Sequence, residues 1–187
     1  QLGLAEDLST LFSCIMANSK TSPDFLIDLL DARSPSGYEE EARAVVQRHV
    51  GDACDSFEID ALGNCLATLG SKNKPTLMMA GHIDELGLII KHVDAKGFLF
   101  FDVIGGHDRS LISGRRVSIL GRKGIVKGVV GKRALHLMTP EDRKKVPLLH
   151  NMWIDVGAKD RDEALSFITI GDPAVYDQSF EIIRGPL

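Results

Sequence analysis

Hydrophobic side chains recur at helical spacing through the opening part of the chain. Residues 1–21 follow this spacing and begin with acidic rather than basic side chains, which predicts an amphipathic helical extension instead of a signal peptide. A Ser-Pro pair opens residues 22–32 and predicts a second helix there. Residues 36–39, Ser-Gly-Tyr-Glu, match a capping box and predict a third helix that runs to Gly51.

The spacing then changes to that of β-strands. Residues 55–59 alternate apolar and polar side chains, a Leu-Gly-Asn turn follows at 62–64, and residues 65–69 run back, which predicts a β-hairpin. Residues 76–80, Thr-Leu-Met-Met-Ala, form an unbroken apolar run of the kind that is buried on both faces of an α/β sheet. Helices, hairpin and buried strand together predict the first half of an α/β domain.

Short β-rich runs separated by glycine-bearing turns follow residue 85, a pattern typical of a small barrel. The expected strands are 86–93, 98–104, 116–120, 124–130, 153–156 and 166–170, with a helical turn at 160–165. We therefore expect a β-rich domain over 85–172, inserted into an α/β domain made of 22–84 and 173–187. Because residues 173–187 are too few to cover both faces of a sheet, we expect the α/β domain to be partial.

Composition narrows the function classes. The chain has 187 residues, 44% of them hydrophobic, and 22 Lys+Arg against 26 Asp+Glu give a net charge of −4, so we expect neither nucleic acid nor a membrane as partner. Its apolar runs are far shorter than the ~20 residues of a membrane-spanning helix. Three cysteines without a CxxC spacing indicate neither a disulfide framework nor a cysteine zinc site, and the cytoplasm is the default compartment.

The chemistry that the sequence suggests is concentrated directly after the predicted buried strand. His82 and Asp84 stand two residues apart at the carboxyl end of that strand, where α/β proteins place ligands. A histidine can offer one ring nitrogen to a metal while a nearby carboxylate accepts the other ring N–H and fixes the tautomer. The same tripeptide is also found as a hydrogen-bonded surface pair without a metal, so both interpretations remain open on spacing alone.

The residues around this histidine resemble a known family. Residues 79–87, Met-Ala-Gly-His-Ile-Asp-Glu-Leu-Gly, are similar to the AGHMDEIG motif of the dinuclear metal aminopeptidases of the tetrahedral (TET) and glutamyl-aminopeptidase type. Further segments match in the same order over roughly residues 22–180. They are 36–39 for the family's SGxE, 60–64 for DxLGN, 105–106 for IGG, 111–117 for LxGxRV, 124–131 for GVIG, and then 139–143, 153–158 and 170–172.

The resemblance implies an α/β fold, with a partial zinc-peptidase-like domain interrupted by an inserted β-barrel-like dimerisation domain. It implies that His82 binds one of two divalent metal ions, zinc or cobalt, and that Asp84 is the catalytic carboxylate that orients it. The family's other metal ligands correspond to positions beyond residue 187, and neither Asp177 nor Glu181 lies in a matching motif. One histidine falls short of the three protein ligands of a catalytic zinc, so we expect this chain alone to bind at most one metal ion, weakly.

Function hypotheses from different classes follow. The first is the N-terminal part of a cytoplasmic metalloaminopeptidase that removes N-terminal residues from a peptide substrate and forms a homo-oligomer, at least a dimer. The alternative is a catalytically inactive, truncated relative that acts as a dimerisation or peptide-binding module. A third hypothesis is a split enzyme, whose missing ligands come from another chain.

The remaining candidate residues offer less chemistry. The Gly-Gly turn at 105–106 lacks a P-loop lysine and is expected to join strands rather than to bind a phosphate. Glu85 is expected to make a structural hydrogen bond. Without a Gly-x-Ser-x-Gly motif or a base beside any cysteine, nucleophilic hydrolysis has no support. The histidines without a partner at ligand spacing are His92, His107 and His150.

Overall fold

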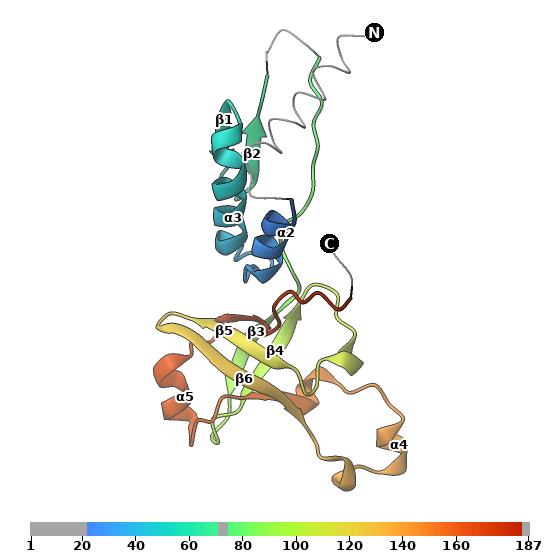
Figure 1. Ribbon diagram of the computed structural model, residues 1–187. Coiled ribbons are helices and arrows are strands. Elements are labelled where there is room, and N and C mark those ends of the chain that lie inside the picture. Colours follow the sequence, from blue (N-terminus) through green and yellow to red (C-terminus); the bar gives the residue numbers. More distant parts are fainter. Residues whose placement is uncertain (1–21, 71–74, 185–187) are drawn as a thin grey trace. The chain divides into compact units, whose positions relative to one another are not determined.

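The computed structural model describes residues 22–70 and 75–184 (Figure 1). The described chain forms two compact units. The first comprises 22–34, 39–70, 75–84 and 179–184, and the second comprises 35–38 and 85–178. The helical extension predicted over 1–21 lies outside the described residues. Within the described ranges, no helix has the length and apolar character needed to cross a bilayer.

Two helices and their small apolar core organise the first unit. Helix α2 spans Ser22–Asp31 and helix α3 spans Glu40–Val50, followed by a 3₁₀ turn, η1, at Gly51–Ala53. Apolar side chains of both helices meet, as their 3.6-residue spacing predicts. The buried members are Ala32, Ala42 and Val45, with Phe25, Leu29 and Ile83 packed against them. This core is small because few residues of the unit contribute to it.

The start of α3 differs from the prediction. Glu39 occupies the N-cap position and makes no side-chain capping hydrogen bond, so α3 begins at Glu40 and not directly after Ser36, as the capping box at 36–39 predicts. Residues 35–38 instead pack with the second unit, where the Tyr38 backbone N–H donates to the Pro35 carbonyl at 2.8 Å. The Ser34 hydroxyl accepts from the Ala42 N–H at 2.8 Å and so satisfies one of the N–H groups in the first turn of α3.

The predicted hairpin is confirmed. Strand β1, Ser56–Ile59, pairs antiparallel with β2, Cys65–Thr68. The turn between them is fixed by Asp60, whose carboxylate accepts from the backbone N–H groups of Leu62 and Asn64 at 2.9 Å. The Asn64 side-chain amide also donates to Asp60 and holds the pKa of that carboxyl below its ordinary value.

The strand predicted at 76–80 is absent. This segment is extended but unpaired with any strand of the described chain, and Leu77, Met78 and Met79 are 71%, 85% and 81% exposed. Successive side chains of an extended chain point to opposite sides, so both sides of the segment lack cover. A strand requires hydrogen-bonded neighbours, and the described residues supply none here.

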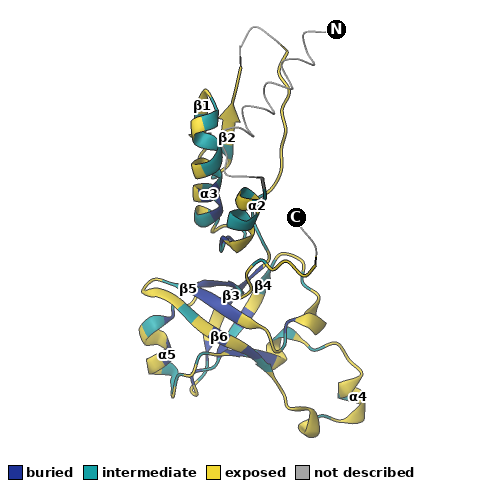
Figure 2. Cartoon of the chain, viewed as in Figure 1, coloured by how far each residue is buried: buried dark blue, intermediate teal, exposed yellow. Residues whose placement is uncertain are grey.

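The second unit is a closed antiparallel barrel with the strand order β3-β4-β7-β6-β5-β8. Its strands are β3 Gly87–Val93, β4 Leu99–Ile104, β5 Arg116–Gly121, β6 Gly124–Lys132, β7 Met152–Asp155 and β8 Pro173–Tyr176. The inward-facing residues are almost fully buried, as the dark blue stretches of the strands show in Figure 2. A complete apolar core of this kind is what stabilises a small barrel.

Short elements connect the barrel strands. Helix α5, Arg161–Phe167, is capped at its N-terminus by Asp160, whose side chain accepts from the Glu163 N–H. The remaining short elements are η2 Arg109–Leu111, η3 Leu135–Leu137, α4 Pro140–Arg143 and η4 Leu149–Asn151.

The end of the barrel lies further along the chain than the spacing predicts. The strand predicted at 166–170 is wrong, because α5 continues to Phe167 and the Asp172 carboxylate then closes a turn by accepting from the Thr169 N–H at 2.7 Å. The closing strand is β8, which pairs with both β3 and β5. The second unit therefore extends past the expected boundary at 172 to Gln178.

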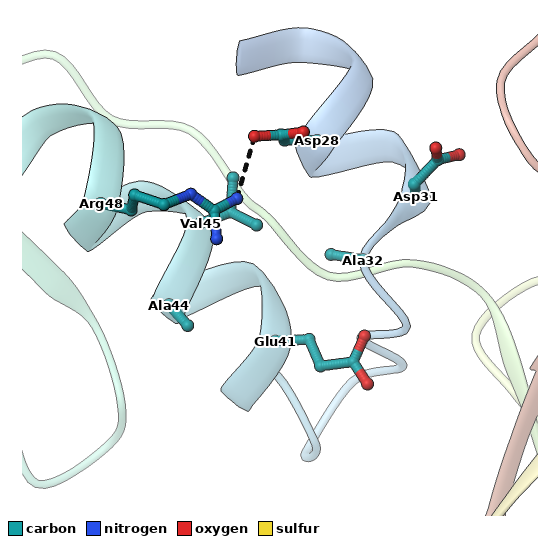
Figure 3. A pocket seen from close by; sticks show the side chains of 7 residues that line it. All are labelled: Asp28, Asp31, Ala32, Glu41, Ala44, Val45 and Arg48. Atoms are coloured by element: carbon teal, nitrogen blue, oxygen red, sulfur yellow. Dashed lines mark hydrogen bonds and ion pairs between the residues drawn. The ribbon is translucent and has the colours of Figure 1, made fainter. Parts of the chain in front are cut away.

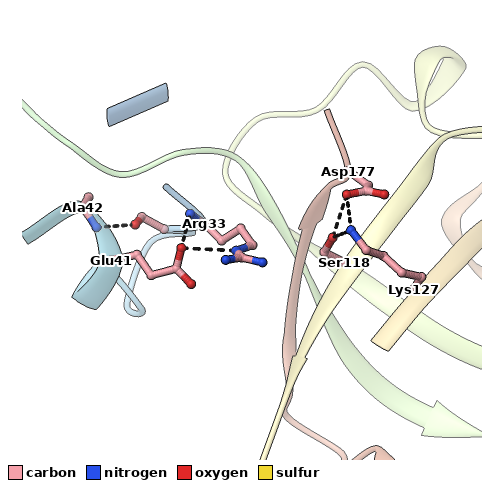
Figure 4. A network of polar contacts seen from close by, with 7 residues as sticks. Arg33, Glu41, Ala42, Ser118, Lys127 and Asp177 are labelled. Carbon is pink, nitrogen blue, oxygen red and sulfur yellow. Dashed lines mark hydrogen bonds and ion pairs between the residues drawn. The ribbon is translucent and has the colours of Figure 1, made fainter. Parts of the chain in front are cut away.

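A polar network joins three segments of the barrel. The Ser118 hydroxyl on β5 donates to Asp177 at 3.0 Å, and the Lys127 ammonium on β6 donates to Ser118 and to Asp177 (Figure 4, right). The hydrogen bond from Lys127, with a further hydrogen bond from Ser118, holds the pKa of the Asp177 carboxyl below its ordinary value. The network therefore stabilises the barrel only while Asp177 is ionised.

A substitution at Gly128 tests how closely the barrel strands pack at this position. A Cβ at this position would lie 2.5 Å from Ile154 Cγ2 and 3.2 Å from the Asp155 carbonyl oxygen, so we expect Gly128→Ala to lower the free energy of unfolding by about 1–3 kcal/mol. Urea unfolding followed by the fluorescence of Trp153, the single tryptophan of the chain, measures this for the barrel. Gly106→Ala is the control, because its Cβ would meet no atom within 4 Å. Equal effects of the two substitutions would contradict the close contact.

Asp177 tests the polar network. Because its pKa is lowered in the folded state, its stabilisation is present above the unfolded pKa of about 4 and is lost as the pH falls through the folded pKa. The barrel of the unaltered chain should therefore lose stability between neutral and acidic pH as Asp177 is protonated. We expect Asp177→Asn to make the free energy of unfolding less dependent on pH in this range. The effect should stay below about 1 kcal/mol because the Lys127 side chain is 61% exposed. Glu141→Gln, a charge removal on exposed α4, should leave the pH profile unchanged.

Candidate functional site

The candidate site lies at the end of the exposed extended segment, within the first unit. Residues 75–82 are exposed, and a Cβ at Gly81 would meet no atom within 4 Å. The backbone before the site is therefore open to any group that approaches it. Only at Ile83 does the segment come into contact with the apolar core of the unit.

Ile83 fixes the direction of its two neighbours. Its side chain packs against the core formed by α2 and α3. In an extended chain, residues on either side of a given residue point to the opposite side. Packing Ile83 inward therefore turns His82 and Asp84 together, away from that core. Sequence analysis missed this role, although an isoleucine between two polar residues is the alternation that signals it.

His82 and Asp84 form a hydrogen-bonded pair. His82 Nδ1 lies 2.9 Å from Asp84 Oδ1, and the two side chains are 87% and 32% exposed. An ionised carboxylate only accepts hydrogen bonds, so the Nδ1 atom carries the proton. The lone pair of Nε2 is then available in an exposed position, which is the arrangement of a metal-binding imidazole.

The pair lacks further ligands in the described part of the chain. Nowhere in residues 22–70 and 75–184 do three or more His, Cys, Asp or Glu side chains come together as a metal site. Asp177 is engaged by Lys127 and Ser118 in the other unit. The donor set present therefore fits a metal through His82 alone, and the ligand roles of His82 and Asp84 remain predictions.

Three other histidines make structural contacts. His107 Nε2 donates to the Ile104 carbonyl at 3.1 Å, and its Nδ1 lies 2.9 Å from the Tyr176 hydroxyl. His92 lies against the ring of Phe100. His49, which the sequence did not single out, has a side chain only 5% exposed and bonds Asp28 at 2.8 Å. The contacts of His49 and His107 hold neighbouring elements together within one unit.

Comparison with known proteins identifies similar chains. The M42 glutamyl aminopeptidase family matches residues 63–186. A putative aminopeptidase of Acetivibrio thermocellus is 38% identical over 141 residues, which cover 75% of this chain and 40% of that protein. The chain thus spans about 40% of the length of this relative.

Solved structures also include chains that are similar to this one. A TET aminopeptidase from the marine sediment archaeon Thaumarchaeota archaeon SCGC AB-539-E09 superposes with a TM-score of 0.82 at 32% identity, over 87% of this chain and 46% of that one. A second similar structure is the Pyrococcus horikoshii TET1 peptidase, which can assemble into a tetrahedron or a large octahedral shell. It superposes with a TM-score of 0.75 at 35% identity, over 86% of this chain and 48% of that one.

The tautomer of His82 is directly measurable. We expect nitrogen chemical shifts of the neutral ring to show a protonated Nδ1 and an unprotonated Nε2. Asp84→Asn should shift the ring toward a mixture of tautomers, because a side-chain amide both donates and accepts. Asp102→Asn, a substitution on barrel strand β4, is the control. A His82 ring that is mainly Nε2-protonated in the unaltered chain would contradict the pairing.

Proposed function

Because the chain belongs to the M42 glutamyl aminopeptidase family, we propose that it supplies the N-terminal part and the barrel of a metal-dependent aminopeptidase. Such an enzyme hydrolyses N-terminal residues from peptides. The observation that carries the proposal is the His82–Asp84 hydrogen bond, within a segment whose sequence matches the metal-binding motif of the family. Peptide substrate and cytoplasmic location are parts of the same proposal.

In this proposal each residue of the pair has a separate role. His82 binds a divalent metal ion, zinc or cobalt, through Nε2, and Asp84 holds the ring in the required tautomer and orientation. Two such ions in a complete site supply an activated water and polarise the scissile carbonyl. In this chain His82 would bind the metal ion and Asp84 would orient the His82 ring. The remaining ligands must come from sequence that the described residues do not include.

The exposed segment before His82 supports an incomplete site. Leu77, Met78 and Met79 are exposed on both sides of an extended backbone, and large apolar side chains in such a cluster are normally covered. We infer that additional polypeptide of the complete protein covers this segment and brings the remaining ligands to His82. This polypeptide either continues the chain or is a separate subunit, as in a split enzyme.

The alternative function is a non-catalytic module. The barrel has a complete core of its own, whereas the described residues hold no metal cluster. A chain with these properties can associate without catalysing a reaction. In either function we propose that copies of the chain associate, at least as dimers, since the TET peptidase of Pyrococcus horikoshii is a large assembly.

Metal titration tests the proposed role of His82. We expect zinc added to the chain to perturb the His82 ring resonances with weak affinity, and we expect His82→Ala to abolish the effect. His92→Ala, an exposed substitution on β3, is the matched control and should leave zinc binding at His82 intact. Stoichiometric zinc binding that survives His82→Ala would contradict the assignment.

Activity then separates the two functions. The chain alone should not hydrolyse an aminoacyl anilide in the presence of zinc or cobalt. The same assay on the protein isolated from its source, with its intact mass measured, distinguishes an enzyme from a module. A mass well above that of 187 residues together with hydrolysis supports the enzyme, and a mass matching 187 residues without hydrolysis supports the module.

A further inference from the structure

A long exposed connection projects from the barrel between β6 and β7. We call residues 132–148 the basic arm; it starts at the last residue of β6, contains η3 and α4, and appears in orange at the lower right of Figure 1. Almost every residue of the arm is exposed. Its large apolar side chains are exposed as well, which is unusual for so short a segment of a stable surface. These are Leu135 at 63%, Leu137 at 57%, Val146 at 52% and Leu148 at 46%.

The arm also carries a marked positive charge. It holds five lysine and arginine side chains against two carboxylates, Glu141 and Asp142. Lys145, 3.9 Å from Asp142, is 72% exposed, so little of this charge is neutralised locally. Lys144 and Lys145 directly precede the exposed Val146. The arm therefore presents apolar side chains flanked by cations.

The first unit contains a surface with the opposite character. A hollow of about 290 Å³ lies between α2 and α3, as Figure 3 shows. Small apolar side chains line part of it, and carboxylates with one arginine line the rest. The apolar residues are Ala32, Ala44 and Val45, and the charged residues are Asp28, Asp31, Glu41 and Arg48.

Charge in the neighbourhood of the hollow is negative in sum, and two of the lining carboxylates also have cationic partners, Asp28 in Arg48 at 2.9 Å and Glu41 in Arg33 at 3.2 Å. Residues 22–50 contain six carboxylates against three arginines. Hydrogen bonds from His49 and Arg48 lower the pKa of Asp28, so this carboxylate is ionised at neutral pH. An apolar surface bordered by carboxylates suits an apolar side chain that is accompanied by lysines or arginines.

We propose that the basic arm of one copy of the chain docks into the α2–α3 hollow of a second copy. The inference rests on the association of copies proposed above and names the surfaces that carry it. Two features select a second copy as the partner. The chain itself presents both complementary surfaces, and exposed apolar side chains on the arm require an apolar contact that water does not provide.

The electrostatic part of this contact has a defined signature. Exposed charges are screened by salt, with a Debye length of about 10 Å at 0.1 M ionic strength and about 3 Å at 1 M. Association through the arm should therefore weaken as salt is added. An association driven by apolar surface alone would be unchanged or strengthened by the same salt.

Sedimentation velocity on the chain over a range of protein and salt concentrations tests the proposal. We expect a reversible association whose dissociation constant rises at least tenfold when both arm lysines are reversed by Lys144→Glu with Lys145→Glu. The matched control is Lys96→Glu with Lys159→Glu, the same charge change at exposed barrel positions outside the arm. The control should change the dissociation constant less than twofold.

A second pair of variants tests the hollow. Ala44 lines the hollow on an exposed position of α3, so Ala44→Arg should fill it with a cation and weaken association to a similar degree. Gln47→Arg places the same charge on the same helix outside the hollow and should have little effect. Circular dichroism confirms that each variant keeps its helices and strands.

The outcomes separate this inference from the proposed function. A wild-type chain that stays monomeric at all concentrations overturns both the association of copies and the docking of the arm. An oligomer that is insensitive to the arm and hollow variants overturns the docking alone and leaves the proposed association standing. Neither result bears on zinc binding by His82, which the titration measures separately.

Discussion

The packing of one isoleucine determines which way the candidate site faces. Ile83 contacts the small core of α2 and α3, and the alternation of an extended backbone then directs His82 and Asp84 to the other side. Their mutual hydrogen bond at 2.9 Å fixes the imidazole tautomer in turn. A weak apolar anchor and one polar contact are thus sufficient to present a ring nitrogen in an open position.

The two units differ in how fully they bury their own apolar side chains. The barrel buries a continuous apolar core and closes its sheet, so within it the backbone is hydrogen-bonded around the ring of strands. The first unit has a core of a few residues and leaves Leu77, Met78 and Met79 exposed. The candidate site belongs to the less complete unit, and this is consistent with ligands that come from further polypeptide.

The sequence predicted those elements whose signal is local. The hairpin was predictable because Asp60 and its glycine turn specify it, and most barrel strands follow from alternating runs between glycines. The helix start at 36–39 and the strand at 166–170 were mispredicted because tertiary contacts decided them. Ser34 accepts from the Ala42 N–H in the first turn of α3, and the turn closed by Asp172 moves the last strand on to Pro173. The His82–Asp84 pair could be anticipated from spacing. The polar–apolar–polar alternation also signalled that Ile83 points away from its neighbours, but not that it packs against α2 and α3, because that contact is tertiary.

The most direct test of the central claim is a crystal structure of the chain with zinc, in which anomalous scattering locates the metal. We expect zinc on His82 Nε2, with His82 Nδ1 still hydrogen-bonded to Asp84 and Ile83 still packed on the helical core. Zinc bound elsewhere, with the His82 ring turned away from Asp84, would contradict it.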